Sequence, residues 1–95
     1  MSHSIKALDV HVAGNNATFN IKGAFINPKF TLNNVEVRYQ PTGIDLFIHS
    51  DYDENGPIIS VTSPFHETIT VNNLKHGKYF VRIDNNNKWV KWFNV

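Results

Sequence analysis

Residues 65–95 read FHETITVNNLKHGKYFVRIDNNNKWVKWFNV, and this stretch decides the fold. Apolar and polar side chains alternate in three short runs, over residues 68–71, 79–84 and 89–93. Gly77 separates the first two runs, and three consecutive asparagines separate the last two. Alternation with a period of two, interrupted by Gly and Asn, is typical of half-buried antiparallel strands. The last third of the chain therefore predicts three strands in succession.

The same alternation extends toward the N-terminus. It predicts further strands over residues 5–12, 17–25, 34–40, 44–48 and 58–62, whereas no segment has a helical period. Gly23 interrupts the inner row of its strand, which indicates a bulge or the close crossing of another segment. The side chains predicted to point inward are Leu8, Val10, Val12, Ala17, Phe19, Ile21, Phe25, Val35, Val37, Tyr39, Ile44, Leu46 and Ile48.

The number and spacing of these strands predict the fold class. Seven or eight short strands, spaced at roughly 8–12 residues, favour an all-β, antiparallel two-sheet Greek-key sandwich. A small Greek-key barrel is the alternative. A chain of 95 residues is long enough for one modest core, so we expect one β-sandwich domain over residues 1–95.

Composition limits the classes of function. Hydrophobic residues make up 41% of the chain and the formal net charge is +1, so we expect a packed domain that binds neither nucleic acid nor a membrane. Cysteine is absent, which excludes disulfides and zinc–thiolate sites. No apolar run approaches the ~18 residues of a membrane span. Residues 1–5 lack the apolar segment of a signal peptide, so we expect either an intracellular protein or a mature form; the compartment itself stays unknown.

The run Leu74-Lys-His-Gly-Lys-Tyr-Phe-Val-Arg-Ile83 resembles the late-strand signature of immunoglobulin-like and fibronectin-III-like sandwiches. Residues 62–95 are also similar to small, uncharacterised bacterial sandwich domains. The resemblance implies an immunoglobulin-like architecture in which Tyr79 forms a corner with the backbone upstream. It also implies binding, spacing or assembly, and it brings no catalytic residues. The chain departs from the pattern at His76-Gly77, where Pro-Gly is common, and in lacking a tryptophan in an early strand.

One acidic loop is a candidate calcium site. Asp51, Asp53 and Asn55 place oxygen-bearing side chains at alternate positions, and Gly56 permits a sharp turn. Thr62 stands where an EF-hand requires a bidentate carboxylate, so an EF-hand is excluded. The sequence leaves open a weak Ca²⁺ loop completed by Asp45 or Glu67, or a solvated loop without a metal.

The sequence gives little support to catalysis. The five histidines, at positions 3, 11, 49, 66 and 76, include no pair spaced to aim two imidazoles at one ion from a strand. A long-range pairing of His49 with His66 is left open, and a pocket lined by both would favour an enzyme. No nucleophile motif is present. We therefore expect a protein that is not an enzyme.

The C-terminal strands carry the preferred binding residues. Phe80, Trp89 and Trp92 predict an aromatic strip that contacts a protein or carbohydrate partner, or a second copy in a homodimer. Trp89 and Trp92 are three residues apart and so face opposite ways on a regular strand. If Trp89 joins Phe93 in the core, Trp92 and Phe80 lie outside. We expect a non-catalytic binding or assembly module, with a weak calcium-binding sandwich domain as the alternative.

Overall fold

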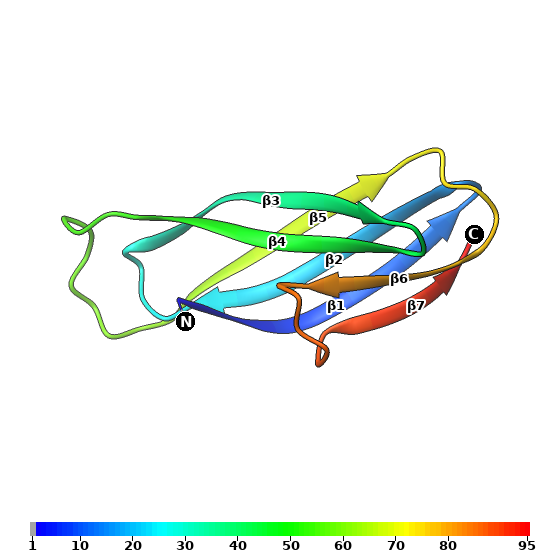
Figure 1. Cartoon of the computed structure of the whole chain (residues 1–95). Helices are drawn as coiled ribbons and strands as arrows, with labels where there is room; N and C mark the ends of the chain where they lie inside the picture. Colours follow the sequence, from blue (N-terminus) through cyan, green and yellow to red (C-terminus); the bar gives the residue numbers. More distant parts are fainter. Residues whose placement is uncertain (1) are drawn as a thin grey trace.

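The computed structural model describes residues 2–95 and contains seven strands in two sheets (Figure 1). Sheet A has three strands in the order β1-β2-β5, and sheet B has four in the order β3-β4-β6-β7. The predicted all-β class is confirmed, and the sheets share no strand, as in a sandwich. The strands are β1 (His3–Ala13), β2 (Asn16–Phe25), β3 (Phe30–Gln40), β4 (Gly43–Tyr52), β5 (Ser63–Val71), β6 (Lys78–Ile83) and β7 (Val90–Asn94).

The two sheets stack into an elongated body of 48 × 22 × 19 Å. The start of β1 and the end of β7 lie toward opposite ends of it (Figure 1). Residues 2–95 include no helix that is long and apolar enough to span a membrane.

One strand pair corrects the predicted topology. β4 and β6 pair in parallel, with Ile44 opposite Val81 and Leu46 opposite Ile83, whereas the other strand pairs are antiparallel. The prediction of purely antiparallel Greek-key sheets is therefore wrong for sheet B. Alternation fixes which side chains face inward, but it carries no information on the direction of a neighbouring strand. Here the chain leaves sheet B after β4, passes through β5 in sheet A, and returns as β6 beside β4.

The core lies between the sheets and follows the alternation closely. Ala17, Phe19 and Ile21 of β2 are fully buried against Ile44 and Leu46 of β4. Because alternate side chains of a strand point to the same side, each strand contributes one apolar row to this shared interior. Of the predicted inward residues, Tyr39 is the exception: it is 67% exposed. Tyr39 lies near the end of the edge strand of the wider sheet, so sheet A does not cover its ring.

A second prediction fails between β4 and β5. The sequence predicts a strand over residues 58–62, but these residues are exposed and in no sheet. β4 belongs to sheet B and β5 to sheet A, so the connection has to cross from one sheet to the other. A segment that leaves one sheet before it joins the next has no neighbouring strand, whatever its intrinsic β propensity.

Gly23 confirms the predicted close crossing. A Cβ atom at residue 23 would lie 2.5 Å from Cζ of Phe65 and 2.7 Å from the carbonyl oxygen of Ser4. The predicted bulge is present as well, on the partner strand, where Lys6 is the extra residue opposite Gly23. The missing side chain of Gly23 thus makes room for the ring of Phe65.

Each edge strand carries a feature that hinders pairing with a further strand. β1 and β3 contain bulges, at Lys6 and Asn33. β5 contains Pro64, which has no N–H to donate, and β7 has only five residues, among them Lys91. Bulges, prolines, lysines and short strands are the usual means of blocking edge-to-edge association. Partner binding by addition of a strand to these edges is therefore disfavoured.

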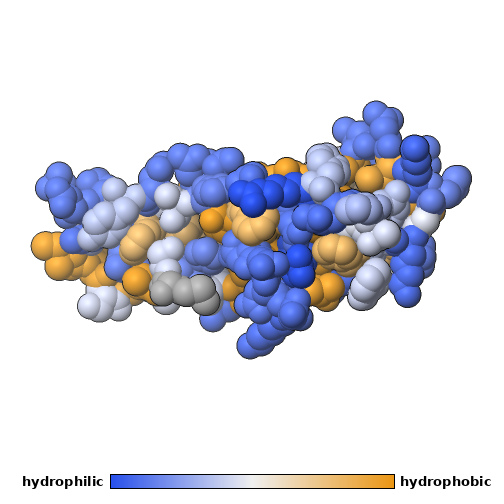
Figure 2. Space-filling model, in the orientation of Figure 1, coloured by the Kyte–Doolittle hydropathy of each residue, from blue (hydrophilic) through white to orange (hydrophobic). Residues whose placement is uncertain are grey.

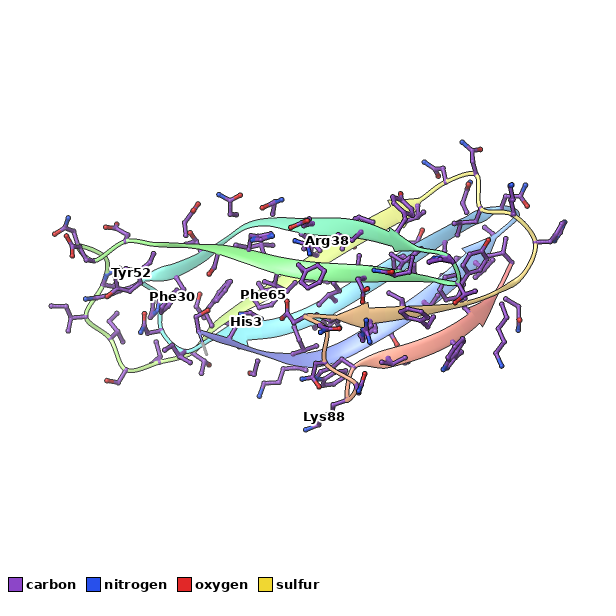
Figure 3. All side chains as sticks on the ribbon, in the orientation of Figure 1. His3, Phe30, Arg38, Tyr52, Phe65 and Lys88 are labelled. Carbon is purple, nitrogen blue, oxygen red and sulfur yellow. The ribbon has the colours of Figure 1, made fainter. Side chains whose placement is uncertain are left out.

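Aromatic side chains close the end of the sandwich where β1 begins. The rings of Phe25 and Phe65 lie 4.8 Å apart, and those of Phe30 and Tyr52 also 4.8 Å apart. Figure 3 shows Phe30 and Tyr52 on the β3–β4 arm, with Phe65 and His3 farther along the body. The stacked rings of Phe25 in β2 and Phe30 in β3, whose centres lie 6.3 Å apart, attach the long β3–β4 arm to sheet A.

Candidate functional site

An aromatic pair occupies the outer face of sheet B, the face turned away from sheet A. Phe80 of β6 and Trp92 of β7 are direct cross-strand partners, and their ring centres lie 5.7 Å apart in an edge-to-face arrangement. Trp92 is 60% exposed. Val81 and Phe93 point into the core, so alternation directs Phe80 and Trp92 outward. The structure thus brings together two of the three residues predicted to form a strip.

Trp89 lies apart from this pair. It precedes β7 and packs against the core, as the spacing of the two tryptophans indicated. It also lines a hollow of about 240 Å³ with His3 and Asp84, between the start of β1 and the end of β6. The aromatic pair therefore consists of Phe80 and Trp92 alone.

Phe80 rests on the backbone of β4. Gly43 is its partner in the parallel pair, and a Cβ atom at residue 43 would overlap the ring. Each ring also has a cation over it: Lys78 Nζ lies 5.2 Å from the centre of the Trp92 ring, and the Arg82 guanidinium lies 5.4 Å from the centre of the Phe80 ring. Both distances fall within the range of cation–π attraction.

Beside the aromatic pair, sheet B buries an ion pair on its outer face. Asp45 of β4 is 2% exposed, and its carboxylate accepts hydrogen bonds from Arg82 Nε at 2.9 Å and Arg82 Nη2 at 3.3 Å. Gln40 Nε2 donates a third at 3.1 Å. Two parallel N–H···O bonds fix the plane of the guanidinium. The pair thereby holds Arg82 in position next to Phe80.

The sequence did not reveal this ion pair. The sequence offers Asp45 only as a residue that could complete a calcium loop, yet its carboxylate is fully engaged by Arg82 and Gln40. Alternation predicts that Asp45 and Arg82 both point outward from their strands. Their contact depends on the parallel pairing of β4 with β6, which alternation does not predict.

A more exposed charge cluster continues the face along β3 and β4. The carboxylate of Glu36 accepts hydrogen bonds from Arg38 Nε and from His49, the latter at 2.7 Å. These two partners, Arg38 first, lower the pKa of Glu36 from 4.5 to about 2. The Arg38 guanidinium in turn lies 4.4 Å above the ring of Phe47. The outer face is therefore a continuous set of aromatic and charged side chains from β3 to β7.

The residues of the predicted calcium loop do not converge. Asp51 lies on β4 and accepts hydrogen bonds from the Asn33 side chain, both at 3.0 Å. Asp53 accepts one from the backbone N–H of Asn55 at 3.0 Å, and Glu67 lies on β5. Within the described part of the chain, no three His, Asp or Glu side chains are grouped to hold a metal ion. Calcium binding stays a prediction, and a rise in Tm at millimolar Ca²⁺ would support it.

The histidines are dispersed. His49 lies on the outer face of sheet B and His66 on the outer face of sheet A, so the two do not line one pocket. His3 has a structural partner that the sequence did not indicate: its Nε2 lies 2.6 Å from Oδ2 of Asp84. Asp84 also accepts a hydrogen bond from the Ile48 N–H at 3.0 Å and has a left-handed backbone, with φ at +53°. This aspartate therefore ties the start of sheet A to the middle of sheet B.

Fold and site together define a small all-β protein of two stacked sheets, with an aromatic and charged outer face on the larger one. Comparisons of this chain with protein-family models, with curated proteins and with solved structures find no match.

Proposed function

We propose that this protein is a non-catalytic binding module that holds a protein partner on the outer face of sheet B. The observation that carries the proposal is the exposure of Trp92, which is 60% accessible although it sits on a regular strand. A partner that covered this ring would remove a large apolar surface from water, which favours binding. Tryptophan and arginine are also the side chains that most often anchor protein interfaces.

The surroundings of Trp92 support a preorganised face. Phe80 is seated on Gly43, and Arg82 is fixed by the buried carboxylate of Asp45. Side chains that are already ordered lose little conformational entropy on binding, which favours affinity. Such order on an outer face, where most side chains are free to move, is consistent with a docking surface.

The charges favour a protein over a carbohydrate. Lys78 lies over the Trp92 ring, which reduces the flat surface on which a sugar could stack. Lys78 and Arg82 both flank the aromatic pair, whereas the Asp45 carboxylate is buried beneath the face. A partner with acidic side chains around an apolar centre would match this pattern.

An immunoglobulin-like relationship belongs to the same proposal. The Tyr79 hydroxyl donates a hydrogen bond to the carbonyl oxygen of Lys75 at 2.8 Å, which is the corner expected from the resemblance. The two-sheet arrangement also supports it. The parallel pairing of β4 with β6 departs from the purely antiparallel sheets of that class, so we propose a relative with a rearranged larger sheet.

The test compares partner capture by three forms of the protein. Immobilised wild type and Tyr39→Ala should recover the same protein, whereas Trp92→Ala should not. Tyr39 is the matched control because it is an equally exposed aromatic residue outside the aromatic pair. Calorimetry with the recovered partner should then give an affinity at least about tenfold weaker for Trp92→Ala, a loss typical of an interface anchor. Equal binding by all three forms would refute the proposal, as would binding of oligosaccharides but no protein.

A further inference from the structure

A second surface, at the opposite end from the β3–β4 turn, is unusually apolar. In the connection between β4 and β5, Ile58 is 93% exposed, and Ile59 and Val61 are exposed as well. A hollow of about 320 Å³ lies between residues 57–60 and the neighbouring Ile26 and Lys29. Figure 2 shows apolar surface gathered at this end of the molecule. Adjacent exposed aliphatic side chains of this kind usually mark a contact with another molecule.

The segment has the composition of a strand without a partner. Residues 58–62 read IISVT, in which four of five side chains are β-branched, and residues 56–65 carry no charge. Pro57 and Pro64 bound the segment. Short, uncharged, β-branched runs have the highest tendency to pair with a copy of themselves. Among the described residues, no backbone hydrogen bond involves residues 57–62, so their N–H and C=O groups are free to pair.

We infer that residues 58–62 of two copies pair as antiparallel strands about a twofold axis, so that the protein forms a homodimer through this segment. A twofold interface pairs a surface patch with itself, so the patch has to be self-complementary. This one meets that condition, because residues 56–65 carry no charge, so a second copy of the segment sets no charged side chain against its apolar centre. The nearest charges lie together beside the segment: Lys29 Nζ donates to the Glu54 carbonyl oxygen at 3.2 Å, and the Lys29 carbonyl oxygen accepts from the Asp53 N–H at 2.9 Å.

The four sheet edges do not offer the same possibility. Each is blocked by a bulge, a proline or a short lysine-bearing strand, as described above. Residues 58–62 lie outside the sheets and contain no proline or lysine, and the chain bends once among them, at Val61. A charged partner would also find no counter-charge within the segment itself. A second copy of the chain is therefore the occupant that the chemistry fits.

The symmetry predicts a register. With the twofold axis at Ser60, Ile59 of one copy lies opposite Val61 of the other, and Ile58 lies opposite Thr62. Directly opposed side chains of an antiparallel pair have Cβ atoms about 4.5–5.5 Å apart. The two copies of Ile59 and of Val61 then form one aliphatic cluster on a single face of the paired strands.

Cysteine cross-linking tests this register directly, because the natural chain has no cysteine. Ser60→Cys places two thiols opposite one another on the axis, within the span of a disulfide. We expect it to cross-link at least about tenfold faster than His11→Cys under mild oxidation, since cross-strand neighbours are held together. His11 is a suitable control because it is exposed on β1, far from the segment. Equal rates for the two variants would overturn the inference.

Sedimentation equilibrium separates this interface from the aromatic face. Ile59→Lys should weaken the dimer at least about tenfold, because it places like charges close to the axis. It should keep the wild-type Tm of the monomer, since residue 59 is exposed. Trp92→Ala should leave the dimer intact. A protein that stays monomeric at millimolar concentration overturns the inference, and so does a dimer lost in Trp92→Ala but retained in Ile59→Lys.

Discussion

The ring of Phe80 lies directly on the backbone of Gly43, so that residue 43 has no space for a side chain. The backbone of β4 cannot move away, because it is bonded to β3 on one side and β6 on the other. We therefore expect Gly43→Ala to displace the ring and to lower the free energy of unfolding by about 1–3 kcal/mol, as overpacking does. Urea denaturation of wild type and variant measures the difference.

A double-mutant cycle identifies the cause of that loss. If the added methyl group acts through the ring, Gly43→Ala should cost clearly less in a Phe80→Leu background. An equal cost in both backgrounds would instead assign the loss to the backbone of β4.

Asp45 and Arg82 provide the second prediction. Asp45→Asn keeps the shape of the side chain but leaves the guanidinium of Arg82 without its counter-charge. Removing one partner of a buried pair is strongly destabilising, so we expect a loss of about 3 kcal/mol in the free energy of unfolding. The double variant Asp45→Leu with Arg82→Leu should be more stable than Asp45→Asn, because it buries no unpaired charge. A double variant that is less stable than the single one would contradict this account.

Glu36 should make stability depend on acid pH. Its pKa is lowered in the folded protein, from 4.5 to about 2, so the unfolded chain takes up the proton first. The contribution of Glu36 is therefore complete above about pH 4.5 and is lost as the pH falls toward 2. We expect the Tm of Glu36→Gln to lie below that of wild type at neutral pH and to converge with it near pH 2. A Tm difference that is constant with pH would exclude this ion pair as the source.

Asp84 should be replaceable by asparagine but not by alanine. Asparagine tolerates a left-handed backbone and keeps an oxygen for the N–H of Ile48, whereas alanine does neither. Loss of the acceptor and of the contact with His3 should cost Asp84→Ala about 2 kcal/mol, the range for an unsatisfied buried donor. Asp84→Asn should lose less than half of this free energy of unfolding. Thermal unfolding of wild type and both variants measures the two losses. Equal losses would show that neither the oxygen nor the backbone conformation matters.

Much of the fold could be predicted from the sequence, because the side of a strand on which a side chain lies depends only on its position along that strand. Alternation placed Phe19, Ile21 and Leu46 in the core without any knowledge of their neighbours. It failed for Tyr39, since burial at the end of an edge strand depends on how far the opposite sheet extends. It failed again for residues 58–62, whose β propensity is satisfied only if another strand is present. Strand direction and strand order are properties of the whole chain, and alternation does not encode them.

The candidate site could be predicted from the sequence only as far as alternation determines which side chains point outward. Spacing separated Trp89 from Trp92, and the structure places one against the core and the other outside. The support beneath the aromatic pair was not accessible: Gly43 and Asp45 contact Phe80 and Arg82 only because β4 and β6 are parallel neighbours. The exposed residues of the aromatic pair could thus be predicted from alternation, whereas the residues of β4 that support them depend on strand pairing.

The parallel contact between β4 and β6 also sets the order in which the chain can assemble. The β1–β2 and β3–β4 hairpins are joined by tight turns and can form locally. β6 reaches β4 only after the chain has crossed the opposite layer as β5 and come back. Such distant contacts contribute only after a large loss of chain entropy, so folding on a millisecond-to-second timescale is expected. The layer that carries Trp92 is consequently the last to be completed, and a nascent chain can form the Phe80–Trp92 pair only after residues 90–94 have been synthesised.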